Sequence, residues 1–168
     1  MNRTAIAVVV ALLAGVAGTQ TAAGASVARC ADASVVVWLD TSPSPSAGSS
    51  YVNVKVTNLA AKRCALRGYP GVSAVDLGGR QLGSAAAREG SAPTHSIVLG
   101  RGDSATALVR ITDVGVFPPA SCHTSFAAGL RVYLPDSTAS KIVPFPVRAC
   151  SRTGRAYLHV HALTTGRP

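Results

Sequence analysis

The stretch YVNVKVT, residues 51–57, alternates apolar and polar side chains without interruption. Successive side chains of a β-strand point to opposite faces of a sheet, so Val52, Val54 and Val56 would share a buried face while Lys55 faces water. This pattern predicts a half-buried strand and indicates that the chain folds around β-sheet.

Shorter segments show the same period of two, and turns rich in glycine or proline, such as DLGGRQLG at residues 76–83, separate them. No window of eleven residues after residue 25 has convincing helical periodicity. We therefore predict an all-β fold, an antiparallel immunoglobulin-like β-sandwich of about eight strands, with a closed barrel as the alternative. The other expected strands are residues 34–39, 72–77, 96–99, 105–112, 130–134, 141–147 and 158–162.

Residues 1–25 combine a basic start at Arg3, an apolar run and small residues at Ala23 and Ala25. This is the pattern of a cleaved secretory signal peptide. The apolar run, residues 5–17, is shorter than the roughly 20 residues that span a bilayer, which argues against a transmembrane anchor. We expect a single domain over residues 26–168 that is secreted without a stable membrane anchor, either released or retained at the cell wall.

Four cysteines follow the expected signal peptide: Cys30, Cys64, Cys122 and Cys150. An even number of cysteines in an exported domain predicts two disulfides. Metal binding is the alternative, but it generally uses close spacing such as C-x-x-C, and the nearest two cysteines here are 28 residues apart. Three pairings are open, and the spacing does not choose among them.

The stretch CALRGYPGV, residues 64–72, predicts a corner between two strands. Pro70 fixes a φ suited to the second position of a turn, and Gly71 is expected to take the positive φ of a type II turn. Tyr69 is expected to pack down and hydrogen-bond to the backbone, in preference to stacking on a ligand.

An ordered series of blocks runs along the chain. It begins with Cys30 before the first expected strand and continues with VTN (56–58), CALRGYPGVSAVD (64–76), GGRQLG (78–83), LGRGDSATA (99–107), TDVGVFPPASC (112–122), GLRVYLP (129–135) and VPFPVRAC (143–150). In this series the chain resembles a known family, the exported actinobacterial proteins grouped as domain of unknown function 4232. The resemblance implies an exported, immunoglobulin-like β-sandwich with no assigned activity, and the order of the blocks implies that Cys30 pairs with Cys64 and Cys122 with Cys150.

The chemistry of common enzymes is not evident in the sequence. The seven acidic residues are isolated from one another, and the G-x-S-x-G, S-x-x-K, H-E-x-x-H and phosphate-loop motifs are missing. We therefore predict a non-catalytic binding domain that needs no cofactor. A secreted hydrolase, with a triad assembled from distant positions, is an alternative.

One pair of residues has the chemistry of a metal site. His159 and His161 are two apart on an expected strand, so both side chains leave the same face and could share a Zn or Cu ion. Further histidines are His95 and His123. In the simpler interpretation the intervening residues face the core and both histidines face water.

The chain is basic, with a formal net charge of +9, and its local cluster is Lys62, Arg63 and Arg67. These residues are candidates for binding anionic polymers of the cell envelope by summed electrostatics. Aromatic residues are few and no basic stripe accompanies them, so we expect no specific nucleic-acid partner. The expected partner is an unidentified protein or an anionic envelope polymer.

Overall fold

The computed structural model describes residues 26–41, 47–91 and 93–166. The predicted signal peptide, residues 1–25, lies outside the described residues. Strands make up most of the regular structure, and they are joined by one four-residue helix and two short 3-10 turns. The elements are η1 Asp32–Ser34, β1 Val35–Asp40, β2 Ser49–Asn58, β3 Cys64–Arg67, β4 Gly71–Val75, β5 Gln81–Leu82, β6 Ala87–Arg88, β7 Ser96–Leu99, β8 Ser104–Thr112, η2 Val114–Val116, α1 Pro119–Cys122, β9 Thr124–Tyr133, β10 Ser140–Cys150, β11 Leu158–Val160 and β12 Thr164–Thr165.

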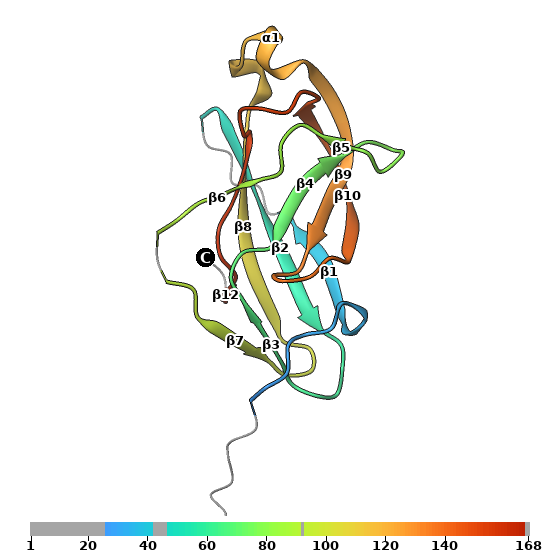
Figure 1. Ribbon diagram of the computed structural model, residues 1–168, viewed down its shortest axis with the longest axis vertical. Helices are drawn as coiled ribbons and strands as arrows, with labels where there is room; N and C mark the ends of the chain where they lie inside the picture. The colour runs from blue at the N-terminus through green and yellow to red at the C-terminus, as the bar shows by residue number, and fades with distance from the viewer. Residues whose placement is uncertain (1–25, 42–46, 92, 167–168) are drawn as a thin grey trace, which may run out of the picture.

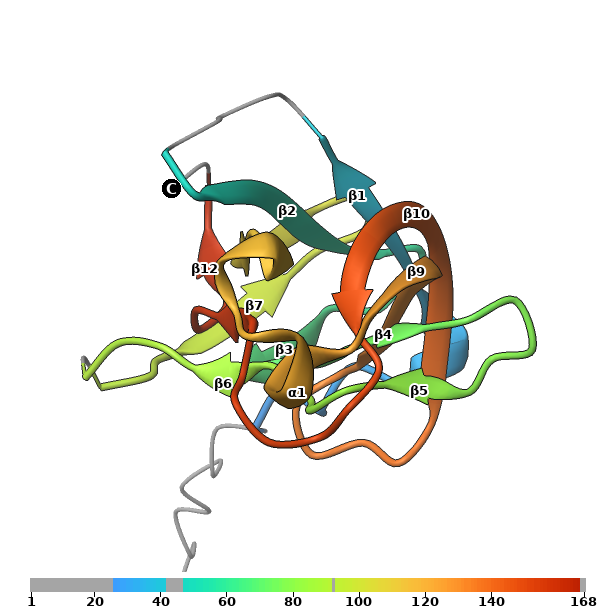
Figure 2. The ribbon, with the colours of Figure 1, turned by 90° about the horizontal axis from the view of Figure 1, so that it is seen from above.

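The strands of the described residues form three sheets. The largest has the order β1-β2-β8-β11-β6, with β12 also paired to β8, and the second has the order β10-β9-β4-β5. β3 and β7 form a separate pair. In the described part of the chain both larger sheets are open, so the fold is all-β without a barrel (Figures 1 and 2). The immunoglobulin-like topology stays a prediction.

Side chains from both larger sheets build one hydrophobic core. Val54 and Val56 of β2 and Val109 of β8 have no exposed surface, and neither do Ala74 of β4 and Leu130 of β9. The buried positions of β2 alternate with partly exposed ones, as residues 51–57 predict. β2 lies between β1 and β8, with Val54 opposite Leu39 and Ala107.

Tyr157, which precedes β11, is the largest side chain among the fully buried residues of the described chain. Its hydroxyl donates a hydrogen bond to the backbone oxygen of Leu82 at 3.2 Å. Burial raises the pKa of the Tyr157 phenol to about 12, because the apolar surroundings disfavour the phenolate. The contact ties the segment before β11 to β5.

Two disulfides staple opposite ends of the molecule, and their pairing is the one that the family resemblance implies. Cys30–Cys64 joins the N-terminal segment to the start of β3, and Cys122–Cys150 joins α1 to the end of β10. In Figure 1, β3 lies at the lower end and α1 at the upper end. The described residues contain no free cysteine.

The corner at residues 68–71 differs from the prediction. Gly68 has the positive φ, 101°, whereas Gly71 begins β4 with an ordinary strand backbone. A Cβ at Gly71 would lie 3.4 Å from the Cβ of Tyr133, which is an ordinary van der Waals contact. The positive φ of a type II turn at Gly71 was therefore a wrong prediction.

The edge strand β10 carries Pro144 and Pro146, both exposed, and its register with β9 shifts after Pro144. Proline has no backbone N–H, so these residues blunt the outer edge of that sheet. No helix among the described residues is long and apolar enough to cross a membrane.

Candidate functional site

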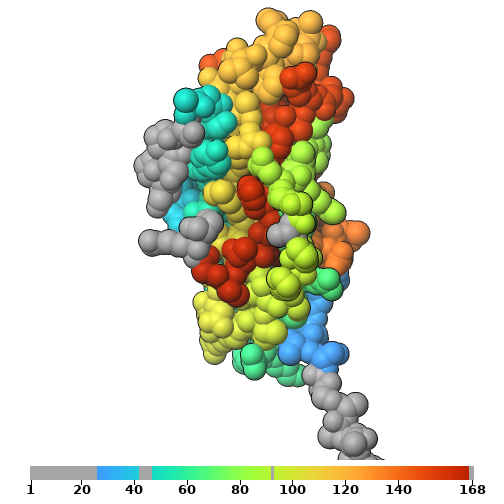
Figure 3. Space-filling model, turned by 90° about the vertical axis from the view of Figure 1, so that its left-hand side faces the viewer, coloured from blue at the N-terminus to red at the C-terminus, as the bar shows by residue number. Residues whose placement is uncertain are grey.

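A groove of about 600 Å³ runs between two segments that are distant in sequence. One wall is formed by residues 89–90 and 93–98, the last of which belong to β7, and the other is the segment 161–165, which ends in β12. Figure 3 shows these two segments, yellow-green and dark red, side by side on one face of the molecule. We call this feature the β7 groove.

The groove exists because the chain leaves the largest sheet after β6. β6 runs parallel to β11, and its last sheet-like bond is from the Glu89 N–H to the Val160 oxygen at 2.9 Å. The chain then departs and returns as β7, which pairs with β3 rather than with β12. Among the described residues β7 and β12 form no strand pair, while Leu163, just before β12, donates its N–H to the backbone oxygen of Gly68 at 2.9 Å.

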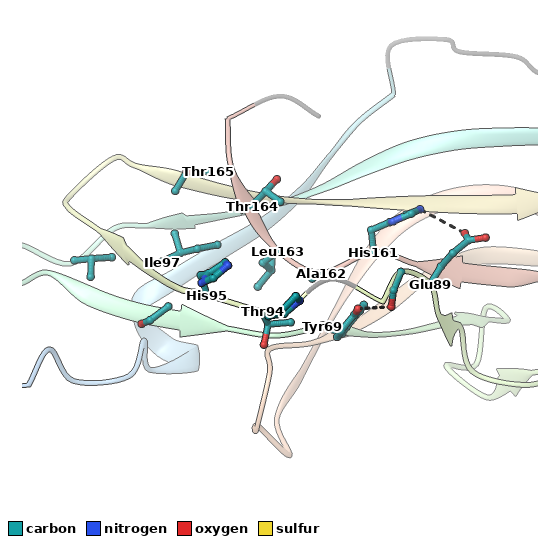
Figure 4. Close-up of a pocket in the computed structure, with 14 residues that line it drawn as sticks. Tyr69, Glu89, Thr94, His95, Ile97, His161, Ala162, Leu163, Thr164 and Thr165 are labelled. Atoms are coloured by element: carbon teal, nitrogen blue, oxygen red, sulfur yellow. Dashed lines mark hydrogen bonds and ion pairs between the residues drawn. The ribbon is translucent and has the colours of Figure 1, made fainter.

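The floor of the groove is apolar and its two ends differ. Leu163 and Ile97 are buried, with 5% and 7% of their surface exposed, and the intermediate surface of Ala162 adds to the floor. Figure 4 shows Ile97 towards one end, and Glu89 and His161 at the other. Ligand sites in proteins commonly combine a concave apolar surface with a few polar groups.

An ion-pair network closes the polar end. Glu89 accepts hydrogen bonds from Arg110, from Nη2 to Oε1 at 2.8 Å and from Nε to Oε2 at 3.2 Å, and His161 Nε2 lies 3.4 Å from Oε2. Hydrogen bonding from Arg110 holds the pKa of the Glu89 carboxyl below its usual value, although burial opposes the shift. The charges of Arg110, His159 and His161 act in the same direction as these hydrogen bonds. A carboxylate held ionised in this way is poorly suited to donate a proton to a substrate.

The two histidines of the predicted metal site, His159 and His161, both lie near Glu89. His159 lies opposite Arg110 in the β8–β11 register and His161 Nε2 lies near Glu89, and the charges of both histidines act on the Glu89 carboxyl. Across the described residues, no group of three or more His, Cys, Asp or Glu side chains is placed to hold a metal ion. His95 lines the β7 groove, and His123 caps α1 at the other end of the molecule. Metal binding by His159 and His161 stays a prediction.

Tyr69 behaves as the sequence predicts and also lines the groove. Its hydroxyl donates to the backbone oxygen of Gly90 at 3.0 Å, which fixes the chain just after β6. The guanidinium carbon of Arg88 lies over the Tyr69 ring, 5.6 Å from its centroid. One tyrosine therefore borders both the groove and a basic surface next to it.

The sequence cluster Lys62, Arg63 and Arg67 is not one compact surface. Lys62 and Arg63 are exposed in the turn before β3, whereas Arg67 is the last residue of β3. At about 3.3 Å per residue along a strand, Arg63 and Arg67 lie roughly 13 Å apart. Arg67 instead lines hollows that two other arginines, Arg29 and Arg88, also line.

Two hollows adjoin at the turn formed by residues 135–136, with volumes of about 160 and 220 Å³. Arg67 lines both of them, Arg29 lines one and Arg88 lines the other. We call Arg29, Arg67 and Arg88 the arginine cluster. No sequence motif reveals it, because its members come from three distant segments.

Each guanidinium group of the cluster is anchored by a contact that leaves donors unused. The anchors are Arg29 Nη1 to the backbone oxygen of Asp136, Arg67 Nε to the backbone oxygen of Thr94 at 3.2 Å, and Arg88 on the ring of Tyr69. Within the described ranges, none of the three arginines forms an ion pair; Asp136 is the carboxylate that lines both hollows. A guanidinium carries five N–H donors, so the cluster offers several to an external anion.

Most carboxylates outside the cluster are engaged in local structure. Asp76 pairs with Arg80, and backbone hydrogen bonding from Arg80 is the main cause that lowers the pKa of Asp76. Asp103 and Asp113 accept backbone N–H groups in turns. The hydrolase alternative stays a prediction to which these contacts lend no support.

Comparison with known proteins gives one positive finding. A model of the family described as domain of unknown function DUF4232 matches residues 30–166. No curated protein and no solved structure matches the chain significantly. Because the match spans nearly the whole described chain, this protein belongs to the DUF4232 family.

Proposed function

We propose that this chain is an exported, non-catalytic binding protein that is held on anionic polymers at or outside the bacterial envelope by the arginine cluster. The observation that carries the proposal is the convergence of Arg29, Arg67 and Arg88 on one turn, without an ion pair from the described residues. Arginine presents a planar fork of donors that matches phosphate and carboxylate groups.

Export is supported by the disulfides and by the sequence pattern of residues 1–25. Two disulfides account for all four cysteines, and such bonds persist in oxidising compartments outside the cytosol. The positive charge of the chain favours retention on an anionic surface, which would concentrate the protein at the wall.

The experiment measures binding of the oxidised chain, residues 26–168, to two defined polyanions, polyphosphate and poly-glutamate. The test variant is Arg29→Gln/Arg67→Gln/Arg88→Gln. The control variant is Arg101→Gln/Arg148→Gln/Arg155→Gln, which removes the same charge from exposed positions outside the hollows. Thermal melting verifies that both variants fold.

A basic side chain close to an anionic surface contributes about 1 kcal/mol, so the test variant, which lacks three of them, should lose roughly 100-fold in affinity. The control variant should lose less than about threefold, because scattered charges act only through the screened general field. Asp136→Asn should strengthen binding, since it removes the carboxylate shared by the two hollows. Equal losses in the two triple variants would show that net charge alone is responsible and would overturn the assignment of the cluster.

A further inference from the structure

We infer that the β7 groove binds an extended acidic segment of a partner protein, which joins the fold as an additional strand along the free edge of β7. Strand pairing in the groove is independent of polymer binding, because it rests on the groove and on the backbone of β7; the preference for an acidic segment shares Arg67 and Arg88 with that proposal. Four observations carry it: the direction of the β7 backbone groups, the room beside them, the unprotected edge and the adjacent positive charge.

The backbone of β7 points hydrogen-bonding groups into the groove. The N–H and C=O of Ala65 in β3 bond to the N-terminal segment, with Ala65 N to Ala28 O at 2.8 Å and Cys30 N to Ala65 O at 3.0 Å. Neighbouring residues of a strand direct these groups to opposite sides, so Cys64 and Leu66 face β7.

The register then shows which residues of β7 direct their backbone N–H and C=O groups away from β3. Cys64 and Leu66 stand opposite Leu99 and Ile97, which therefore turn their backbone groups towards β3. Ser96 and Val98 turn theirs the other way, and both residues line the groove. No hydrogen bond outside the strand ladders reaches the backbone of either residue from the described part of the chain.

The groove has room for one extended segment. Its opposite wall, β12, pairs on one side with β8 through Thr164 and Thr165, and it makes no strand pair with β7. The volume of about 600 Å³ lies within the roughly 300–1,000 Å³ of typical ligand sites. Alternate side chains of an added strand point to opposite faces, so apolar ones can cover Ile97 and Leu163 while the others face water.

This edge lacks the features that usually block strand addition. The edge strand β10 carries two exposed prolines, whereas β7, with the sequence SIVL, has neither a proline nor a charged residue. Natural proteins normally blunt exposed edges with such residues, because unpaired strands recruit other chains. An unblunted edge beside an apolar groove therefore fits a strand-binding function.

The charge beside the groove selects an acidic occupant. Tyr69 and Thr94 line the β7 groove and also the hollow that contains Arg67 and Arg88, so the two spaces are neighbours that share these residues. Tyr69 lies near Glu89 in Figure 4, so this hollow adjoins the end of the groove that carries Glu89, and the Glu89 carboxylate is already paired with Arg110. An Asp or Glu side chain at the end of an added strand can reach the unpaired arginines, while a lysine there would be repelled.

The test uses pools of capped hexapeptides in which Val, Leu or Phe alternates with Thr, and which carry two Glu residues at one end. Matched pools carry two Lys residues, or have N-methylated backbones at every second residue. Each pool is added to the oxidised chain at up to about 1 mM, and amide hydrogen exchange of the protein is followed by NMR. N-methylation removes donors of the added strand but keeps its side chains, so it tests strand pairing without altering the protein.

The Glu pools should slow exchange of the Ser96 and Val98 amides at least tenfold, and the Lys and N-methylated pools should not. Arg88→Gln should weaken the effect of the Glu pools about threefold or more, while the matched control Arg155→Gln leaves it unchanged. Unaltered Ser96 and Val98 amides with every pool, or equal effects of the methylated and unmethylated pools, would overturn the inference. Polymer binding has no requirement for these amides, so its success or failure is judged separately.

Discussion

Asn58 shows how one buried polar side chain can hold three segments together. It has no exposed surface, and its Nδ2 donates to the backbone oxygens of Lys62 and Leu99 at 3.0 and 3.1 Å. Its Oδ1 accepts the N–H of Ala60 at 3.0 Å. The end of β2, the turn to β3 and the end of β7 are thereby joined. The asparagine of the block VTN is a structural residue by these contacts.

Replacing Asn58 with alanine should lower the free energy of unfolding by about 2–4 kcal/mol, because buried backbone groups lose their partners. Urea denaturation measures the change. Asn53→Ala is a matched control on the same strand, since Asn53 Oδ1 is buried without a hydrogen-bond partner. The control should change stability by less than about 1 kcal/mol. Similar losses in the two variants would contradict the role assigned to Asn58.

Gly83 and Gly102 allow two reasons for requiring glycine to be compared, a positive φ alone and a positive φ together with a lack of space for a side chain. Both have positive φ, 66° and 85°, but a Cβ at Gly83 would lie 2.6 Å from the backbone oxygen of Cys150, whereas a Cβ at Gly102 meets nothing within 4 Å. Gly102→Ala should cost about 1 kcal/mol from backbone conformation alone. Gly83→Ala should cost about 3 kcal/mol or more, because the backbone must also move. Calorimetric melting of the two variants compares them, and equal shifts in Tm would exclude the clash.

At the scale of elements, most strands of three or more residues could be predicted, including β7 and β11, and the two-residue strands could not. Residues 51–57 alternate strictly, and β2 includes all of them. β5, β6 and β12 have two residues each, which is too short for a period of two to be visible. Their existence depends on pairing with strands that are distant in sequence.

The candidate sites were hidden for the same reason. The β7 groove arises where the segment 89–98 leaves one sheet for another, and this is a property of topology. The arginine cluster shares only Arg67 with the basic residues that the sequence groups together. Tyr69, whose contact depends on local turn geometry, was correctly predicted to bond to the backbone.

The pair between Glu89, just after β6, and Arg110 of β8 makes stability depend on pH. The folded-state pKa of Glu89 is lowered from 4.5, so its contribution is present above that value and is lost as the pH falls through the folded pKa. Glu89→Gln should therefore cost about 1 kcal/mol at pH 7, a figure reduced by screening because 35% of the side chain is exposed. Urea unfolding of both proteins from pH 7 to pH 3 checks this. A difference that persists in full at pH 3 would show that the ion pair is not its cause.

For the whole molecule, removing each disulfide in turn distinguishes effects on stability from effects on polymer binding. The two cysteines of each disulfide are 34 residues apart in Cys30–Cys64 and 28 residues apart in Cys122–Cys150. In the chain-entropy model each disulfide contributes roughly 3 to 4 kcal/mol to the free energy of unfolding. Cys30→Ala/Cys64→Ala and Cys122→Ala/Cys150→Ala should lower the free energy of unfolding by similar amounts in urea titrations. Only the first should also weaken binding to polyphosphate, because Arg29 adjoins Cys30 and Arg67 ends β3. Equal binding of polyphosphate by both variants would contradict the prediction that the Cys30–Cys64 disulfide positions the arginine cluster.

The two proposed binding surfaces lie next to each other, away from the end of the molecule that carries α1. The most direct test of the account is NMR of the arginine Nε–Hε groups of the oxidised chain, residues 26–168, during titration with polyphosphate. The account predicts saturable shifts for Arg29, Arg67 and Arg88, with Arg101 and Arg155 nearly unchanged. Small, uniform shifts of all exposed arginines would show attraction by net charge alone and would contradict a built anion-binding site.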